Sequence, residues 1–289
     1  MFAHALALTE TSRNWWAHPA RKHILSLRKR ATKDLFDSFK DEDIKGMKKA
    51  IADGADPNGK DFSGNTLLHS LWRISSRVRH VVLDLLLKAG ANIDAVGEWG
   101  LTPIFSFFEP QIVDLLAKAG ANVNKPDHAG KTPIFYAIDD EVVLTSLIRA
   151  NAEMNVRDKR GKTILHYSAT GRNVMCMVMA LRHGANPAIR DNDGNSPLHQ
   201  LAKMTRAKFM KDTYWGEDDG DEDDVLAGYY QKTKAAFLIL YGAKVHAKNN
   251  AGKTPLDLVR DNAVREALVA SPAELRAFVR QHYDVDVSS

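Results

Sequence analysis

Two short sequence patterns recur along this chain of 289 residues, and they keep the same spacing. One is a tetrapeptide similar to Thr-Pro-Leu-His, and the other is a step similar to Gly-Ala-Asn. The tetrapeptides begin at Thr66, Thr102, Thr132, Thr163, Ser196 and Thr254, and the steps begin at Gly54, Gly90, Gly120, Asn151, Gly184 and Gly242. Both series are spaced by 36, 30, 31, 33 and 58 residues. Two patterns with one spacing and one shared anomaly predict an array of similar units.

Each pattern has a physical role at the end of a helix. The Thr or Ser hydroxyl can accept a hydrogen bond from a free N–H at a helix start, and Pro suits the first turn because its φ is preset. The Gly of the closing step tolerates the left-handed conformation that ends a helix, and Asn151 is the next most tolerant residue type there. An apolar stripe precedes the step, for example Val82, Leu85 and Leu86. We therefore expect a pair of helices in each unit.

With a period near 33 residues and a Thr-Pro-Leu-His motif, the chain resembles the ankyrin-repeat family over roughly residues 34–270. The resemblance implies an all-α fold, a solenoid of helix–loop–helix–β-hairpin units. We expect about seven repeats, at 34–61, 62–96, 97–127, 128–158, 159–191, 192–249 and 250–270. The first lacks the tetrapeptide and is expected to cap the stack with a more polar outer face.

The segments outside the repeats differ in charge and pattern. Residues 1–33 are basic, and we expect a capping helix there, with a partner, membrane or nucleic-acid contact, or a nuclear address at Arg28–Arg30, as alternatives. Residues 271–289 predict a C-terminal capping helix and tail, because Ser271 and Glu274 have the spacing of a capping box. Repeat six is about 25 residues too long, which predicts an acidic and aromatic insertion at about 204–230 between its helices.

The repeats also depart from the family motif at one position. Phe105 and Phe135 stand in repeats three and four where the family has His, a residue that in the family hydrogen-bonds across neighbouring loops. We expect these repeats to be joined by apolar contact. His69, His166 and His199 keep the family residue and are expected to be structural, since the same position in successive repeats does not make a metal set.

Composition and motifs argue against catalysis and against nucleic-acid or membrane binding. The net charge is only +4, which disfavours a dedicated nucleic-acid binder, and no apolar stretch is long enough to span a bilayer. The sequence contains no phosphate-binding loop, dinucleotide fingerprint or His-Glu-x-x-His motif. Its one cysteine, Cys176, lies in an apolar run and is expected in the core. We predict no enzyme activity, no cofactor, no metal, no nucleic-acid or membrane partner, and a chain that is monomeric when free.

The family resemblance implies that a partner protein contacts the hairpin tips and the exposed, concave side of the first helices. By position, the candidate contacts are Phe62, Glu98, Trp99, His128, Tyr136, Lys159, Arg160, Tyr167 and Lys203. In the insertion the candidates are Tyr214, Trp215, Asp218, Asp219, Asp221, Glu222, Asp223 and Asp224. Large aromatic and Arg side chains dominate binding energy at interfaces. The alternatives are that charged tips only keep the array soluble and that the insertion is a solvated loop.

These observations predict a non-enzymatic protein–protein interaction module, a scaffold or adaptor, or an effector that a bacterium directs into a host. The alternative is an inhibitor or immunity-type protein whose acidic insertion masks a basic partner surface. Because the chain has a single cysteine, a reducing compartment is expected, the cytoplasm of the producing cell or of a host.

Overall fold

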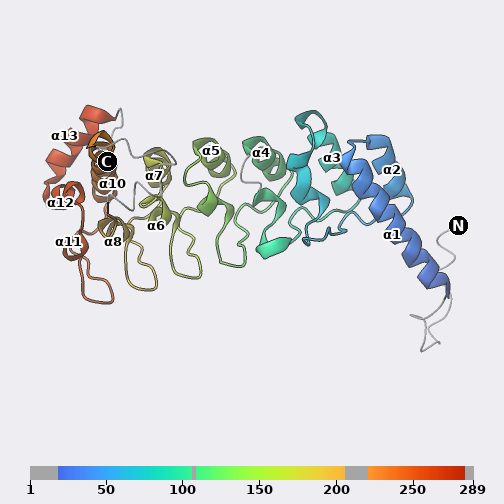
Figure 1. The fold of residues 1–289 in the computed structure, drawn as a ribbon, viewed down its shortest axis with the longest axis horizontal. Coiled ribbons are helices and arrows are strands. Elements are labelled where there is room, and N and C mark those ends of the chain that lie inside the picture. The colour runs from blue at the N-terminus through green and yellow to red at the C-terminus, as the bar shows by residue number, and fades with distance from the viewer. Residues whose placement is uncertain (1–18, 106–108, 206–220, 284–289) are drawn as a thin grey trace. The chain divides into compact units, whose positions relative to one another are not determined.

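The computed structural model describes residues 19–105, 109–205 and 221–283 (Figure 1). In these ranges the regular elements are α-helices and 3₁₀ helices, with no strand. The chain divides into two compact units, Met1–Glu98 and Trp99–Ser289, which we call unit 1 and unit 2. The division falls inside the hairpin of repeat three.

Unit 1 is built on one long helix. It contains α1 (Pro19–Lys40), α2 (Ile44–Ala52), the 3₁₀ helix η2 (Leu67–Arg73) and α3 (Ser76–Lys88). Ala31, Leu35 and Phe39 are buried at helical spacing in the C-terminal half of α1, which packs on α2. The first helix of repeat one and the predicted N-terminal capping helix are therefore one continuous helix.

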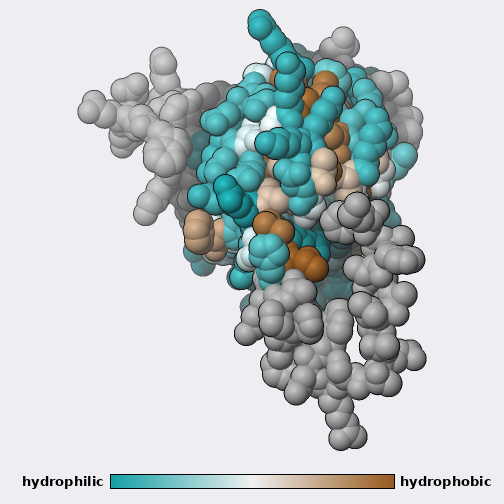
Figure 2. Space-filling model, turned by 90° about the vertical axis from the view of Figure 1, so that its right-hand side faces the viewer, coloured by the Kyte–Doolittle hydropathy of each residue, from teal (hydrophilic) through white to brown (hydrophobic). Residues whose placement is uncertain are grey.

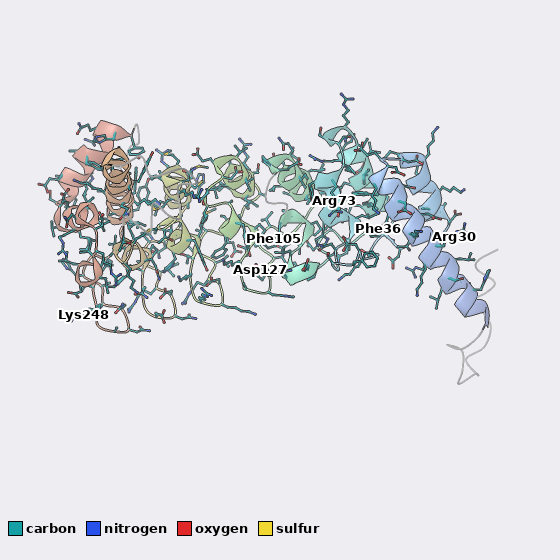
Figure 3. All side chains as sticks on the ribbon, viewed as in Figure 1. Arg30, Phe36, Arg73, Phe105, Asp127 and Lys248 are labelled. Carbon is teal, nitrogen blue, oxygen red and sulfur yellow. The ribbon has the colours of Figure 1, made fainter. Side chains whose placement is uncertain are left out.

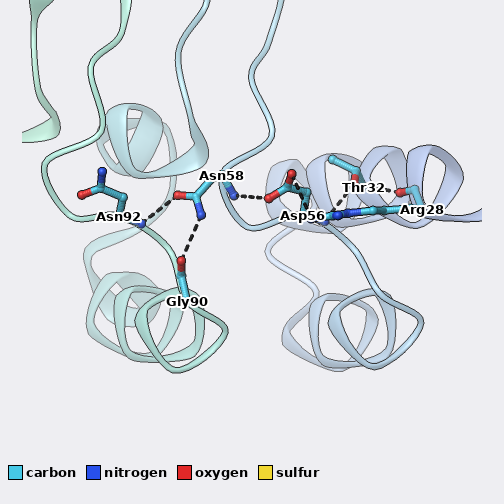
Figure 4. A network of polar contacts seen from close by, with 6 residues as sticks. All are labelled: Arg28, Thr32, Asp56, Asn58, Gly90 and Asn92. Atoms are coloured by element: carbon cyan, nitrogen blue, oxygen red, sulfur yellow. Dashed lines mark hydrogen bonds and ion pairs between the residues drawn. The ribbon is translucent and has the colours of Figure 1, made fainter. Parts of the chain in front are cut away.

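Residues 23–30 of α1 are exposed. Ile24, Leu25 and Leu27 lie among exposed neighbours, and Figure 2 shows apolar side chains between hydrophilic ridges on this face of unit 1. Polar contacts hold α1 to the loops of the first repeats (Figure 4). Thr32 Oγ1 accepts from the backbone N–H of Asp56 at 2.9 Å, and the neighbouring Arg28 pairs with the Asp56 carboxylate at 3.2 Å.

Unit 2 repeats a short first helix and a longer second helix. The first helices are η4 (Pro103–Phe105), η5 (Pro133–Tyr136), α6 (Ile164–Ser168), α8 (Pro197–Ala202) and α11 (Pro255–Leu258). The second helices are α4 (Pro110–Lys118), α5 (Glu141–Arg149), α7 (Val174–Arg182), α10 (Asp221–Leu240) and α12 (Asn262–Val269), and α13 (Pro272–His282) follows. In repeat four the first helix is the short 3₁₀ helix η5, which agrees with the short spacing of that repeat. In repeat three the residues that follow η4, 106–108, lie outside the described residues.

Local sequence sets the ends of these helices, but not through the predicted tetrapeptide hydroxyl in every repeat. The Thr132 hydroxyl is buried without a hydrogen-bond partner in the described structure and does not cap η5. Asp140 accepts hydrogen bonds at 3.0 Å from the backbone N–H groups of Val142 and Val143 at the start of α5. Asn151 closes repeat four with φ 62°, the left-handed conformation expected at the closing step. The Ser271–Glu274 capping box at the start of α13 is confirmed, since Glu274 Oε2 lies 2.7 Å from the Ser271 backbone nitrogen.

The hairpins between repeats are tight turns. In repeat four the backbone N–H of Asp127 donates to the carbonyl of Lys131 at 2.8 Å, and Asp127 Oδ1 accepts from the N–H groups of Ala129 and Lys131. The same arrangement recurs around Asp158, around Asp191 and around Asn249, the last with Asn as the acceptor. Neighbouring tips are joined by backbone hydrogen bonds, such as that from the N–H of Lys159 to the Ala129 carbonyl at 3.0 Å. The hairpins therefore form an ordered row.

The predicted insertion is partly helical. Residues 206–220 lie outside the described residues, but α10 begins at Asp221, inside the predicted insertion, and continues to Leu240. Tyr229 on α10 contacts Phe278, His282 and Tyr283 around α13, with ring centroids 5.2 to 6.4 Å apart. This aromatic cluster holds α13 against α10.

Candidate protein-binding surface

The candidate contacts of unit 2 gather on its hairpins and first helices. We call this the hairpin surface, defined by the residues Trp99, His128, Tyr136, Lys159, Arg160, Tyr167 and Gln200. Figure 3 labels Asp127 at the base of one hairpin and Lys248 on a later one. The other two predicted contacts at tips, Phe62 and Glu98, are exposed and belong to unit 1.

One hydrogen bond repeats from hairpin to hairpin on this surface. Tyr136 donates from its hydroxyl to Asp127 Oδ2 at 2.5 Å, and Tyr167 donates to Asp158 Oδ2 at 2.6 Å. In the next repeat Gln200 takes the same place. Burial, followed by the hydrogen bond and the charge of the neighbouring Asp, raises the pKa of both tyrosines. The hydroxyls are thus engaged within the repeat, and the exposed parts of the rings remain for a partner.

Aromatic contacts join these tyrosines to the preceding repeats. The ring of Phe105 meets that of Tyr136 edge to face at 5.9 Å, and Phe135 meets Tyr167 at the same distance. Both phenylalanines are buried, whereas Tyr136 is 40% exposed. The phenylalanines that replace the family His therefore position Tyr136 and Tyr167 on the hairpin surface. We call this contact between repeats the apolar joint, and it agrees with the apolar contact expected from the sequence.

Two kinds of basic side chain must be distinguished on the hairpins. Arg157 donates to the carbonyls of Gly161 and Arg190 at 3.1 and 3.0 Å, so its guanidinium joins successive hairpins. Arg190 repeats this arrangement with the next hairpin. By contrast, Lys159 and Arg160 are exposed at the tip, and their side chains meet no partner among the described residues. Of these four basic side chains, only Lys159 and Arg160 at the tip are available to a partner protein.

Trp99 has the most unusual conformation on this surface. Its φ is 63°, in the left-handed region that is uncommon for bulky residues, and its side chain is 71% exposed. Its carbonyl accepts from the backbone N–H of His128 at 3.0 Å, which holds the tip against the next hairpin. Strained residues that the surrounding structure holds in place cluster at binding sites. The hydrogen bond to His128 explains the backbone conformation of Trp99, but nothing in unit 2 buries most of its indole.

Comparison with known proteins agrees with this geometry. A family model described as ankyrin repeats, in three copies, matches residues 139–211. The crystal structure of the ankyrin repeat domain of Bcl-3, a member of the IκB family, superposes with a TM-score of 0.65 and covers 82% of this chain and 98% of that domain. This chain contains ankyrin repeats. At 19% identity the Bcl-3 likeness shows the fold alone.

Curated relatives share the ankyrin repeats over a small part of their own length. SH3 and multiple ankyrin repeat domains protein 2 of Homo sapiens is 21% identical over 265 residues, which is 88% of this chain and 12% of that protein. Neurogenic locus notch homolog protein 1 of Mus musculus is 30% identical over 151 residues, 52% of this chain and 5% of that protein. The chain thus spans about an eighth or less of these relatives.

The other predicted contacts of the ankyrin repeats have different environments. Lys203 donates from Nζ to Asn195 Oδ1 at 3.0 Å, which ties it to its own repeat. Tyr214, Trp215, Asp218 and Asp219 lie outside the described residues. Asp221, Glu222, Asp223 and Asp224 open α10, but their side chains also lie outside the description.

The histidines that keep the ankyrin motif are structural, as expected. Thr163 donates from its backbone N–H to Nδ1 of His166 at 3.0 Å, so the ring proton is on Nε2, which donates to the Asn195 carbonyl at 2.9 Å. Burial lowers the pKa of His166, while the bond to Asn195 raises it. His199 repeats the bond across hairpins, to Lys253. These rings link ankyrin repeats and do not face a ligand.

The described residues include no cluster of His, Cys, Asp and Glu that could hold a metal ion. Cys176 is buried, and burial raises the pKa of its thiol to about 12, so it lacks the thiolate that a nucleophile needs. In the same described ranges, no helix has the length and apolar character that crossing a bilayer requires.

Lys131 and Lys162 are not among the contacts predicted from the sequence. The structure places their ammonium groups over the ring of Tyr167, at 4.2 and 5.6 Å from its centroid. A signal for them was present, since each follows the Gly of its hairpin and precedes the Thr of the tetrapeptide. The tyrosine rings that these lysines contact lie on the first helices, η5 and α6. The sequence alone therefore could not show that the lysines and tyrosines lie together.

Proposed function

We propose that this chain holds a partner protein on the hairpin surface of unit 2 and performs no catalysis. Its ankyrin repeats and the relatives that share them support a protein–protein interaction module. The observation that carries the proposal is Trp99, an exposed indole on a strained backbone. A fixed aromatic side chain gives up little conformational entropy on binding, which favours it as an anchor.

Site-directed photo-crosslinking tests this proposal. A photoreactive phenylalanine analogue replaces Tyr136 or Trp99, and a matched variant carries it at Val142, an exposed position on α5. We expect adducts with the native cell's proteins from the first two positions, which unlabelled wild-type protein competes away. Adducts that form equally from Val142, or that wild type does not compete, would contradict the proposal.

Within this class we propose a stand-alone adaptor or host-directed effector, monomeric when free and acting in the cytoplasm of the producing cell or of a host. The repeat array offers the partner surface, while the acidic insertion supports the alternative of an inhibitor that masks a basic partner. Replacing the carboxylates of residues 217–224 with the corresponding amides separates the two roles. An adaptor keeps its crosslinked partner after the replacement, whereas an inhibitor that acts through the insertion loses it.

A further inference from the structure

Two lysine ammonium groups from successive hairpins converge on one aromatic ring in unit 2. Lys131 Nζ lies 4.2 Å from the ring centroid of Tyr167 and 5.4 Å from that of Tyr136, so it lies near both tyrosines. Lys162 Nζ lies 5.6 Å from the centroid of Tyr167. The attraction between a cation and an aromatic face holds both ammonium groups near Tyr167.

The residues that form this grouping are fixed by their own repeats. The backbone N–H of Lys131 donates to Asp127 Oδ1 at 2.9 Å, and that of Lys162 donates to Asp158 Oδ1 at 2.8 Å. The Tyr167 ring is held at its hydroxyl by Asp158 and at its edge by Phe135. Both lysines are half-buried, so their stems lose less freedom on binding than those of fully exposed lysines.

The positive charge of the grouping has no partner on the described surface. Neither Lys131 nor Lys162 forms an ion pair with a carboxylate of the described residues. The carboxylates of their own hairpins are buried and already accept hydrogen bonds, Asp127 and Asp158 each from two backbone N–H groups and a tyrosine hydroxyl. A partner that supplies an anion here would meet two donors and no competing group.

We propose that Lys131 and Lys162 form a subsite for the carboxylate side chains of an acidic protein segment that binds beside Tyr167. This inference rests on the proposed function, since it names the partner's chemistry at that surface. Lys159 and Arg160 at the neighbouring tip extend the positive field and steer an acidic segment toward the subsite.

The surroundings favour a protein carboxylate over a nucleic-acid backbone. A backbone with one charge per nucleotide needs a continuous basic track. Here the basic positions are interrupted by the exposed carboxylate of Asp193 at the next tip and by the indole of Trp99 at the other end. A short acidic segment needs only the local grouping.

The test measures binding of a fluorescent hexaglutamate peptide by anisotropy, with hexaglutamine as the uncharged probe. The double variant Lys131→Met and Lys162→Met removes both charges and keeps apolar stems over the ring. The matched control, Lys118→Met and Arg182→Met, removes two exposed charges from the last turns of α4 and α7. Circular dichroism verifies that each variant is folded.

We expect the subsite variant to bind hexaglutamate about tenfold more weakly than wild type, and the control variant to stay within about twofold. Wild-type affinity should fall with salt, and hexaglutamine should not bind. Absent binding by wild type, or equal losses in both variants, would overturn the subsite. Tighter binding of a 20-nucleotide single-stranded DNA that the subsite variant alone loses would reassign it to phosphate.

The same variant separates this inference from the proposed function. If Tyr136 still crosslinks its competed partner when both lysines are replaced, the binding surface stands and the carboxylate subsite is overturned for that partner. If hexaglutamate binds at the subsite but no competed adduct forms at Tyr136 or Trp99, the subsite stands and the proposed partner surface fails.

Discussion

Repeats three and four differ from repeats five and six of unit 2 at the last position of the tetrapeptide. In repeats five and six His166 and His199 bond the Thr or Ser of their own tetrapeptide and a carbonyl of the next hairpin. In repeats three and four the position holds Phe105 and Phe135, which make edge contacts with the tyrosine of the next repeat. One array thus uses a polar joint and an apolar joint in succession.

The apolar joint leaves a polar group unpaired. Thr102 and Thr132 are the threonines of the Phe repeats, and their hydroxyls are buried without a hydrogen-bond partner in the described structure. An unsatisfied buried hydroxyl costs about 1–3 kcal/mol, whereas burying a phenylalanine side chain contributes about 1.5–3 kcal/mol. The unpaired hydroxyl therefore offsets part of the free energy gained by burying the ring. Only the Phe joint positions an aromatic ring on the hairpin surface.

The largest expected effect comes from breaking the apolar joint. Phe135→Ala removes a buried ring and its contact with Tyr167, so we expect a loss of about 3–5 kcal/mol in the free energy of unfolding. Urea denaturation followed by circular dichroism measures it. Val142→Ala, on an exposed side chain of α5, serves as the control and should change little. A loss below about 1 kcal/mol for Phe135→Ala would show that the apolar joint is not what holds the middle repeats.

Lys234 is a buried ionisable side chain in repeat six, one of the two repeats with the polar joint. Lys234 on α10 is fully buried, it donates to the Gly171 carbonyl, and burial lowers its pKa from 10.5 to about 8. The unfolded chain therefore binds a proton more readily than the folded one between pH 8 and 10.5, so stability should rise with pH across that range. The penalty at pH 7 is about 3 kcal/mol.

Lys234→Met should remove this pH dependence and raise the free energy of unfolding at pH 7 by up to about 3 kcal/mol. Denaturation at a series of pH values measures both effects. Lys232→Met is the control, since Lys232 is half-buried and paired with Glu266 at 2.7 Å. If the free energy of unfolding of the wild type does not change from pH 8 to 10.5, burial of the Lys234 ammonium does not destabilise the folded protein.

Converting the polar joint to the apolar one should have a smaller effect. His166→Phe leaves the Thr163 hydroxyl and the Asn195 carbonyl without their bonds to the ring, which we expect to cost about 2 kcal/mol. Thermal or urea unfolding measures it, with His246→Phe at an exposed position as the control. If His166→Phe matched or exceeded wild-type stability, the two joints would be interchangeable and the comparison would fail.

The polar joint should also be sensitive to acid. Burial lowers the pKa of His166 below its usual 6.5, so the unfolded chain binds the proton more readily, and stability falls as the pH drops below about 6.5. We expect this fall to be shallower in His166→Phe. Parallel slopes for the two proteins, measured by denaturation from pH 7 downward, would exclude the ring as its source.

The smallest expected effect concerns the tyrosine that the apolar joint positions. Tyr167→Phe keeps the ring and its contact with Phe135 but removes the bond to the buried Asp158 carboxylate, at a cost of about 1 kcal/mol. Tyr241→Phe is the control, since the Tyr241 hydroxyl has no bond in the described structure. A loss no larger than that of the control would show that Asp158 is satisfied by its backbone bonds alone.

Much of the fold could be predicted because its rules are local. The Ser271 cap and the left-handed Asn151 act within a few residues of themselves, so their spacing along the chain carries the information. The continuity of α1 through residue 33 could not be predicted from the tetrapeptide, because the first repeat lacks one. The candidate contacts Tyr136 and Tyr167 were placed by repeat position, but their hydroxyl bonds to hairpin carboxylates depend on side-chain geometry.

The amino-acid order alone determined the repeat period, the helix ends and the replacement of His by Phe in two units. Only the tertiary structure decided which hairpin groups remain available, because Arg157 and Lys162 have the same charge in the sequence but different partners in space. Stacking brings residues about thirty positions apart into contact, and the free energy of such contacts depends on distance and direction, which a linear sequence does not state.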